Sequence, residues 1–170
     1  EDRMNEITRF EEINDPDRVG IEQSEIDNAV FSKGSFWKSE AFFGSLHGVT
    51  DTMVGYAGGL KSNPTYTDKG DHSESVDITY DTSTSYQELI NAFWDSYQPV
   101  NRVRRKISKS LVLFRNDEQK VIAYETRSRK EFERGFTFQV DIRSLSHFHL
   151  AEEFHQKYHL RSFPKLIKVA

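Results

Sequence analysis

Apolar and polar residues alternate over several short stretches of the chain, as they do in half-buried β-strands. The clearest case is the segment 74–80, where Val76, Ile78 and Tyr80 fall on one face. Other stretches share this alternation, or the apolar content of a buried strand. They are 29–31, 49–56, 111–114 and 137–142. The pattern predicts strands at all of these places.

In the segments between the predicted strands, apolar residues recur at helical spacing instead. The segment 85–97 is predicted to be an amphipathic helix, with an inward face made of Leu89, Ile90, Phe93 and Trp94. Ser83 or Ser85 precedes its first turn and can cap it, because serine side chains accept hydrogen bonds from free backbone N–H groups there.

A long, highly charged helix is predicted over 117–134. The stripe expected to face the core contains Val121, Tyr124 and Phe132. Shorter helices are predicted over 35–46 and 151–158.

Strands and helices therefore alternate along the chain, but with irregular connections. Some strands are separated by a helix and others only by a loop, which favours a two-layer α+β sandwich with a mixed sheet over a doubly wound parallel sheet. The 170 residues suit one such domain. We expect an N-terminal arm over 1–27, the domain over 28–160 and an extended tail over 161–170.

Composition narrows the classes of function. The chain contains no cysteine, which excludes disulfides, thiolate metal sites and thiol nucleophiles within these residues. A net charge of −4 makes nucleic acid an unexpected partner. No apolar run approaches 18 residues, so no membrane span is expected. Because the sequence begins with Glu1 rather than Met, we expect a processed or trimmed product.

Several short motifs follow one another in a recognisable order. Residues 34–40 read G-S-F-W-K-S-E, 54–59 read V-G-Y-A-G-G and 63–66 read N-P-T-Y. Further on, 70–76 read G-D-H-S-E-S-V and 151–158 read A-E-E-F-H-Q-K-Y. Together they resemble the peptide methionine-sulfoxide reductases of the A type, and in particular a divergent, type-A5-like subgroup that also carries G-S-F-W. The resemblance implies a mixed sheet with flanking helices and a ferredoxin-like core.

The same resemblance assigns roles to site residues. In the family a cysteine thiolate at the start of a helix attacks the sulfoxide sulfur, and a carboxylic acid protonates the departing oxygen. Here Ser35 occupies the cysteine position, and Glu74 corresponds to the acid. Phe36 and Trp37 would cage the sulfoxide methyl group, and Tyr66 would offer a hydroxyl. Phe36 and Trp37 are also compatible with ordinary core packing, Tyr66 with a loop anchor and Glu74 with a surface ion pair.

A second departure from the family lies between the helix at 85–97 and the strand at 111–114. The family's acidic and tyrosine pocket residues have no counterpart there, and the segment carries Arg102, Arg104, Arg105 and Lys106 instead. This basic run, continuing to Lys109, is compatible with a solvated loop or with an acidic partner. A second unrelated loss favours natural divergence over a laboratory Cys-to-Ser change.

Two other chemistries use residues of this sequence. His155 and His159 are spaced to share a helix face with Glu152 and so to hold a zinc ion, but the family motif accounts for that block without metal. A serine hydrolase is disfavoured because no G-x-S-x-G elbow is present. We therefore expect no metal and no cofactor.

Three functions remain, of which a new enzyme that uses Glu74 and a histidine for acid–base work rests on fold-level analogy alone. The favoured one is a catalytically inactive homologue that binds methionine- or methionine-sulfoxide-containing peptides or proteins through a remodelled pocket. The alternative is a peptide-methionine (S)-S-oxide reductase in which Ser35 stands for an engineered nucleophile. The subgroup resemblance leads us to expect a secreted or lumenal location rather than a cytoplasmic one.

Overall fold

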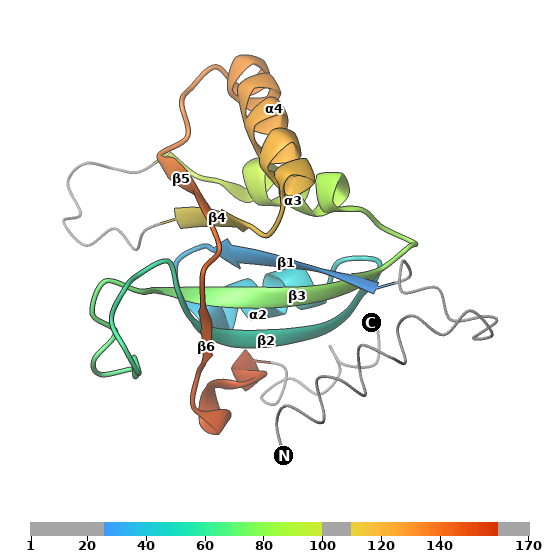
Figure 1. Cartoon of the computed structure of the whole chain (residues 1–170). Helices are drawn as coiled ribbons and strands as arrows, with labels where there is room; N and C mark the ends of the chain where they lie inside the picture. The colour runs from blue at the N-terminus through green and yellow to red at the C-terminus, as the bar shows by residue number, and fades with distance from the viewer. Residues whose placement is uncertain (1–25, 100–109, 160–170) are drawn as a thin grey trace, which may run out of the picture.

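The computed structural model describes residues 26–99 and 110–159. The described strands form one six-stranded mixed sheet in the order β5-β4-β1-β3-β2-β6 (Figure 1). The strands are β1 (Ile26–Ser32), β2 (Val49–Ala57), β3 (Ser73–Asp81), β4 (Ser110–Phe114), β5 (Val140–Ser144) and β6 (Phe148–Leu150). Only β4 and β5 run parallel, and the other pairs are antiparallel.

The described residues also form three α-helices: α2 (Phe36–Gly44), α3 (Tyr86–Ser96) and α4 (Asp117–Arg134). The ring of Phe31 in β1 stacks on Phe43 of α2 and on Phe93 of α3, so α2 and α3 cover the same face of the sheet. The Trp94 indole N–H donates to Thr126 of α4 at 2.9 Å, which joins α4 to the same layer. The α+β sandwich predicted from the sequence is confirmed.

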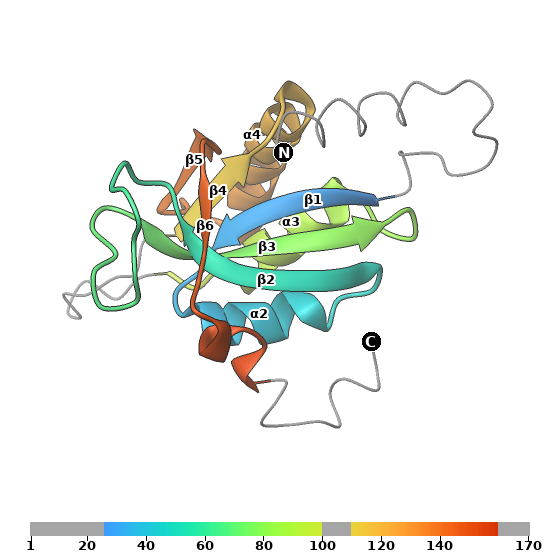
Figure 2. The same cartoon turned by 60° about the horizontal axis from the view of Figure 1, so that its bottom comes forward.

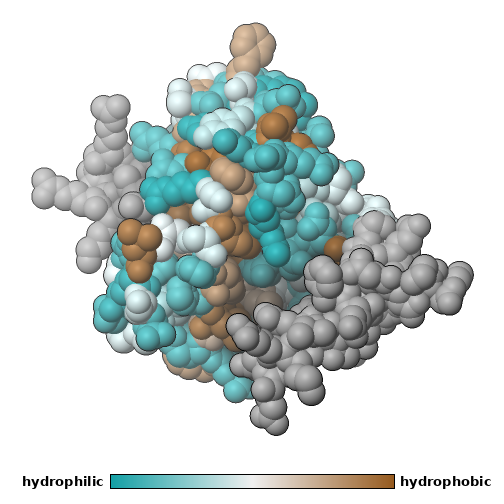
Figure 3. All heavy atoms as spheres, in the orientation of Figure 1, coloured by the Kyte–Doolittle hydropathy of each residue, from teal (hydrophilic) through white to brown (hydrophobic). Residues whose placement is uncertain are grey.

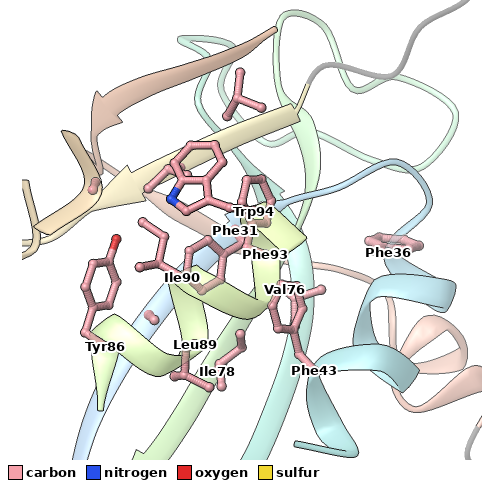
Figure 4. Close-up of a cluster of buried hydrophobic side chains, with 14 of the residues drawn as sticks. Phe31, Phe36, Phe43, Val76, Ile78, Tyr86, Leu89, Ile90, Phe93 and Trp94 are labelled. Carbon is pink, nitrogen blue, oxygen red and sulfur yellow. The ribbon is translucent and has the colours of Figure 1, made fainter. Parts of the chain in front are cut away.

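The main core lies between this helical layer and the sheet (Figure 4). It contains the apolar residues that alternation and helical spacing had placed inward, among them Val76, Ile78, Leu89, Ile90 and Phe93. As expected, Ser85 caps α3, accepting a hydrogen bond from the Glu88 N–H at 3.2 Å.

A smaller apolar cluster covers the opposite face of the sheet. It is formed by Val30, Ala57, Leu111 and Leu113, with Leu145 and Phe148 packed against it. The segment that joins β5 to β6 crosses this face in Figure 1, and hydrophobic atoms form a band over it in Figure 3. Only three residues join β5 to β6, and the four Cα–Cα steps from Ser144 to Phe148 span at most about 14 Å, so these strands, at opposite ends of the strand order, can be joined only if the sheet curls. The Arg143 guanidinium, on β5, donates to the Gly58 carbonyl just beyond β2 at 3.3 Å, as a curled sheet allows.

The predicted core stripe of α4 is wrong. Val121, Tyr124 and Phe132 are 53%, 47% and 90% exposed. The buried residues of this helix are Gln119, Ala123 and Thr126. Gln119 and Thr126 are polar, but each is hydrogen-bonded inside the fold, so a scan for apolar residues passes over the face that is buried.

Two other predictions need correction. The segment 151–158 is not an α-helix: residues Glu153–His155 form a single 3₁₀ turn, and Lys157 has a positive φ of 55°. The strand predicted over 137–142 begins at Val140. The predicted arm over 1–27 lies almost entirely, and the tail over 161–170 wholly, outside the described residues. Among the described helices none is long and apolar enough to cross a bilayer.

Candidate functional site

Ser35 lies half-buried at the start of α2. Gly34 has a φ of +63°, a conformation that glycine adopts without strain, and it turns the chain from β1 into the helix. Ser35 is the N-cap residue, yet its side chain does not cap: its carbonyl accepts the Ser39 N–H at 3.0 Å and its hydroxyl makes no capping bond. The Ser35 hydroxyl therefore sits half-buried at the positive end of a helix, uncommitted to the local structure.

A carboxylate lies at the same helix end. Glu74, near the start of β3, accepts a hydrogen bond from the Phe36 N–H at 3.5 Å. Its other oxygen pairs with the Lys69 ammonium at 3.0 Å. The site therefore holds a carboxylate and an ammonium together, and Lys69 is a proton-bearing group that the sequence analysis missed.

Aromatic rings surround this helix end. Phe36 and Trp37 lie 6.2 Å and 5.9 Å from the Tyr66 ring, and both pairs are stacked. Trp37 also stacks on Tyr158 at 4.3 Å. Phe36 is wholly buried, as the core alternative required, so Trp37 and Tyr66 are the cage residues that reach the surface.

The cage is closed in this structure. Carbon atoms in contact are about 3.5–4.0 Å apart, so a methyl group between two parallel rings needs roughly 7–8 Å. The Trp37 and Tyr66 centroids are 5.9 Å apart. Tyr66 is on the loop between β2 and β3 and is 36% exposed, so it is the ring that has room to swing outwards.

A chain of polar contacts runs behind the cage. The Trp37 indole N–H donates to His155 Nδ1 at 3.1 Å, so the ring proton of neutral His155 is on Nε2. His155 is fully buried, and its Nε2 lies 3.4 Å from Glu152 without the geometry of a hydrogen bond. Glu152 in turn accepts from the Tyr56 hydroxyl at 3.1 Å and from the Tyr66 N–H at 3.4 Å. These contacts fix the orientation of Trp37 and the base of the Tyr66 loop.

The charge states of this chain of contacts follow from its environment. Burial, together with the hydrogen bond to Glu152, raises the pKa of Tyr56, which therefore remains a donor. Desolvation would raise the pKa of Glu152, but hydrogen bonds from its own backbone, Tyr56 and the Tyr66 backbone outweigh it and hold this pKa below its usual value. Glu152 is thus a fixed carboxylate behind the cage.

A family model described as "Peptide methionine sulfoxide reductase" matches residues 27–168. The chain belongs to this family.

Three relatives show how far the likeness extends. The chain is 35% identical over 164 residues to peptide methionine sulfoxide reductase A5 of Arabidopsis thaliana, covering 92% of this chain and 62% of that protein. The chain is 37% identical to the Drosophila melanogaster peptide methionine sulfoxide reductase, over 81% of this chain and 57% of that protein. It is 33% identical to peptide methionine sulfoxide reductase MsrA 1 of a Nostoc strain, over 83% of this chain and 94% of that protein. The chain therefore spans about three-fifths of the first two reductases and nearly all of the third.

Solved structures agree on the fold. The methionine sulfoxide reductase A of Corynebacterium diphtheriae superposes with a TM-score of 0.67 at 22% identity, over 84% of this chain and 77% of that one. Reduced Mxr1 of Saccharomyces cerevisiae superposes with a TM-score of 0.69 at 18% identity, over 88% of this chain and 92% of that one. The mixed sheet with helices on one face is thus the fold of this reductase family.

Within that fold the structure brings five predicted site residues to one place: Ser35, Phe36, Trp37, Tyr66 and Glu74. The predicted contact residues Arg102, Arg104, Arg105 and Lys106 lie outside the described part of the chain. Sequence reasoning missed Tyr56, Lys69, Glu152, His155 and Tyr158 as neighbours of the cage. All but Lys69 lie in motifs that carry the family resemblance, but a regular helix over 151–158, as the sequence predicts, differs from the irregular segment that brings Glu152, His155 and Tyr158 to the cage.

The zinc alternative loses its geometric basis. It needed His155 and His159 on one face of a helix, but the 3₁₀ turn ends at His155, and Lys157, with a φ of 55°, interrupts helical backbone between the two histidines. In the described parts of the chain no three His, Asp or Glu side chains are grouped so as to hold a metal ion.

Glu40 fixes the helix on which the site is built. Its side chain is buried on α2 and accepts hydrogen bonds from the Thr52 hydroxyl on β2, at 2.8 Å, and from the Lys157 backbone N–H. Desolvation raises the pKa of Glu40 above its ordinary value of 4.5, although both hydrogen bonds oppose the shift. Glu40 therefore links α2, β2 and the segment after the 3₁₀ turn.

This raised pKa predicts a specific pH dependence of stability. The folded state holds the Glu40 proton more tightly than the unfolded state, so native stability falls as the pH rises from 4.5 through the folded-state pKa. Glu40→Gln has no proton to lose. Urea unfolding between pH 4 and 8 should therefore show the native chain losing stability relative to Glu40→Gln as the pH rises. A difference that is flat, or that runs the other way, would contradict the assignment.

Proposed function

We propose that this chain is a methionine-sulfoxide-binding member of the reductase family that does not itself reduce its ligand. The observation that carries the proposal is Ser35 at the start of α2, in a sequence of 170 residues without cysteine. The positive helix end that would lower the pKa of a thiol is present, but the thiol is not.

The number of electrons that sulfoxide reduction requires supports the proposal that this chain does not reduce its ligand. Converting a sulfoxide to a thioether and water takes two electrons and two protons. A thiolate supplies the electrons by becoming a sulfenic acid, which a second thiol then reduces. The Ser35 oxygen has no comparable oxidation step, and no other residue of these 170 carries a thiol.

The surroundings of Ser35 suit the ligand nonetheless. A sulfoxide has a partly negative oxygen, which seeks donors, and a methyl group, which seeks apolar surface. The Ser35 hydroxyl, the Lys69 ammonium and the end of α2 supply donors and positive potential. The Trp37 and Tyr66 rings supply the apolar wall once Tyr66 swings outwards. The relatives' names indicate peptide-bound methionine sulfoxide as the ligand class.

The second candidate is an active peptide-methionine (S)-S-oxide reductase for which Ser35 stands in place of a cysteine. It is favoured by the grouping of Glu74, Trp37 and Tyr66 around Ser35, which a lone Cys-to-Ser change would leave in place. The natural gene decides between the two, because a cysteine codon at position 35 would restore the enzyme.

The test is a binding measurement. A short peptide containing one methionine sulfoxide and its unoxidised twin are titrated into the chain by calorimetry. We expect the sulfoxide peptide to bind about tenfold more tightly, and Trp37→Ala to weaken it by about tenfold, the effect of losing one aromatic contact of about 1.4 kcal/mol.

The control is Phe132→Ala, which removes an aromatic ring that is 90% exposed on α4. It should leave both affinities unchanged. Equal affinities for the two peptides, or full binding by Trp37→Ala, would refute sulfoxide binding at this cage.

A further inference from the structure

Lys69 joins the two parts of the candidate site, the carboxylate and the aromatic wall. Its ammonium lies 3.0 Å from Glu74 Oε2 and 4.6 Å from the centroid of the Tyr66 ring, over the face of that ring. The side chains of Lys69 and Glu74 are only 31% and 20% exposed, so water and salt screen these contacts less than on an open surface. Lys69 lies between the motifs at 63–66 and 70–76, so the family resemblance assigns it no role.

The loop that joins β2 to β3 is fixed at its base. It projects beyond the ends of these two strands (Figure 2). At the base, the backbone N–H groups of residues 59–61 donate to the side chains of Asp71 and His72 at distances of 2.8–3.1 Å. The base can therefore stay in place while the tip of the loop, residues 62–70, moves and carries Tyr66 outwards.

Two polar contacts hold this tip against the rest of the site. Within the tip, a turn over residues 65–68 closes on itself through two backbone hydrogen bonds, at 3.0 and 3.1 Å, so Tyr66 moves with the turn. The Tyr66 N–H donates to Glu152 at 3.4 Å, and Lys69 pairs with Glu74 at 3.0 Å. The second contact is shorter and joins two opposite full charges, so it is the stronger of the two.

The ammonium also attracts the Tyr66 ring into the closed position. A cation over the face of an aromatic ring is held by the negative charge of that face. Because Lys69 is paired with Glu74 at the start of α2, it draws the ring towards this helix end, where Tyr66 stacks on Trp37 at 5.9 Å. Moving Tyr66 outwards costs the contact between ammonium and ring unless the ammonium gains another partner.

A sulfoxide oxygen is such a partner, and a thioether sulfur is not. The ammonium has three N–H donors, of which the hydrogen bond to Glu74 uses one. A sulfoxide oxygen carries partial negative charge and can accept another, whereas the sulfur of unoxidised methionine is only a weak acceptor. The oxidised side chain can therefore compensate for the lost contact between Lys69 and Tyr66.

We propose that Lys69 determines the specificity of the cage, by making its opening depend on the sulfoxide oxygen. Without ligand, Lys69 holds the Tyr66 ring against Trp37. With ligand, its ammonium stays paired with Glu74, donates to the sulfoxide oxygen and releases the Tyr66 ring. Unoxidised methionine offers no acceptor of this strength, so it leaves the cage closed. This inference rests on the proposed function, because it concerns the same site.

The first test uses the free chain and needs no ligand. The aromatic proton shifts of Tyr66 are measured by NMR in the native chain, Lys69→Met and Lys69→Arg. We expect Lys69→Met to move these shifts towards those of an unstacked tyrosine, and Lys69→Arg to keep them. Lys61→Met is the control, because it removes the same charge from the same loop, where Lys61 pairs with Asp68 at 3.0 Å. Unchanged shifts in Lys69→Met, or an equal change in Lys61→Met, would overturn the proposal.

The second test repeats the calorimetric titration with the sulfoxide peptide and its unoxidised twin. Lys69→Met should weaken binding of the sulfoxide peptide about tenfold, as expected for losing one charge-assisted hydrogen bond. It should not weaken binding of the twin, and Lys69→Arg should keep the preference for the sulfoxide. A full preference in Lys69→Met would overturn the role of Lys69 while leaving sulfoxide binding intact. Equal affinities for the two peptides in the native chain would instead overturn sulfoxide binding itself.

Discussion

Replacing Ser35 by cysteine is expected to turn the chain into a methionine sulfoxide reductase in the presence of dithiothreitol. The new thiol would lie at the start of α2, where the helix end favours the thiolate, and beside the Glu74 and Lys69 pair. The thiolate attacks the sulfoxide sulfur, the thioether leaves, and the sulfoxide oxygen stays on the cysteine as a sulfenic acid; dithiothreitol then reduces this acid to the thiol, releasing water and forming its own cyclic disulfide. In the overall reaction, sulfoxide and dithiol give thioether, cyclic disulfide and water.

The gain should be large. Losing the nucleophile of a well-studied protease lowers kcat by about 10⁶-fold, so restoring one should raise turnover by at least about 10³-fold above the native chain. Mass spectrometry of the peptide product measures it. Ser45→Cys is the control, because it places a thiol at the other end of the same helix. Activity in Ser35→Cys alone supports an intact pocket; equal activity in both variants would mean that any surface thiol suffices and would contradict the site.

Truncating Phe31 to alanine is expected to cause the largest loss of stability. Its ring is fully buried and stacks on Phe43, Phe93 and Tyr86 at centroid distances of 5.1, 5.2 and 6.0 Å. It is therefore the contact through which β1, α2 and α3 share one core. Removing a buried phenylalanine lowers the free energy of unfolding by about 3–5 kcal/mol, a large part of the 5–15 kcal/mol typical of a domain.

Urea unfolding of Phe31→Ala measures this loss. The control, Ile26→Ala, is in the same strand but 62% exposed, and it should change the free energy of unfolding by less than about 0.5 kcal/mol. A loss below about 1 kcal/mol in Phe31→Ala would contradict the central place of this ring. Since β1 leads directly into Gly34 and Ser35, Phe31→Ala should also weaken the packing of the start of α2.

The sequence predicted the fold where side chains of one kind mark one face. Val76, Ile78 and Tyr80 in β3, and Leu89, Ile90, Phe93 and Trp94 in α3, are all buried as expected. The long helix α4 does not follow this pattern, because its buried Gln119 and Thr126 are polar side chains hydrogen-bonded to Asn28 and Trp94, and its Phe132 is exposed. Strand β6 has three residues, too few for any periodicity, and it pairs with β2 only because the sheet curls.

The site was predictable only in part. Ser35, Phe36 and Trp37 are consecutive, so one motif located them together. Tyr158 and His155 reach Trp37 from more than a hundred residues away, through an irregular segment that no periodic pattern describes. The closure of Trp37 against Tyr66 depends on a loop conformation, which residue types alone do not specify.

The measurement that tests the central claim most directly is turnover by the native chain. The chain is incubated with an excess of methionine-sulfoxide peptide and either dithiothreitol or a thioredoxin reducing system, beside Ser35→Ala, and the methionine formed is counted by mass spectrometry. The absence of thiols predicts no product above the Ser35→Ala level over many equivalents of peptide. Product that rises above that level, and beyond one equivalent per chain, would show that these residues reduce sulfoxide without a cysteine and would contradict the account.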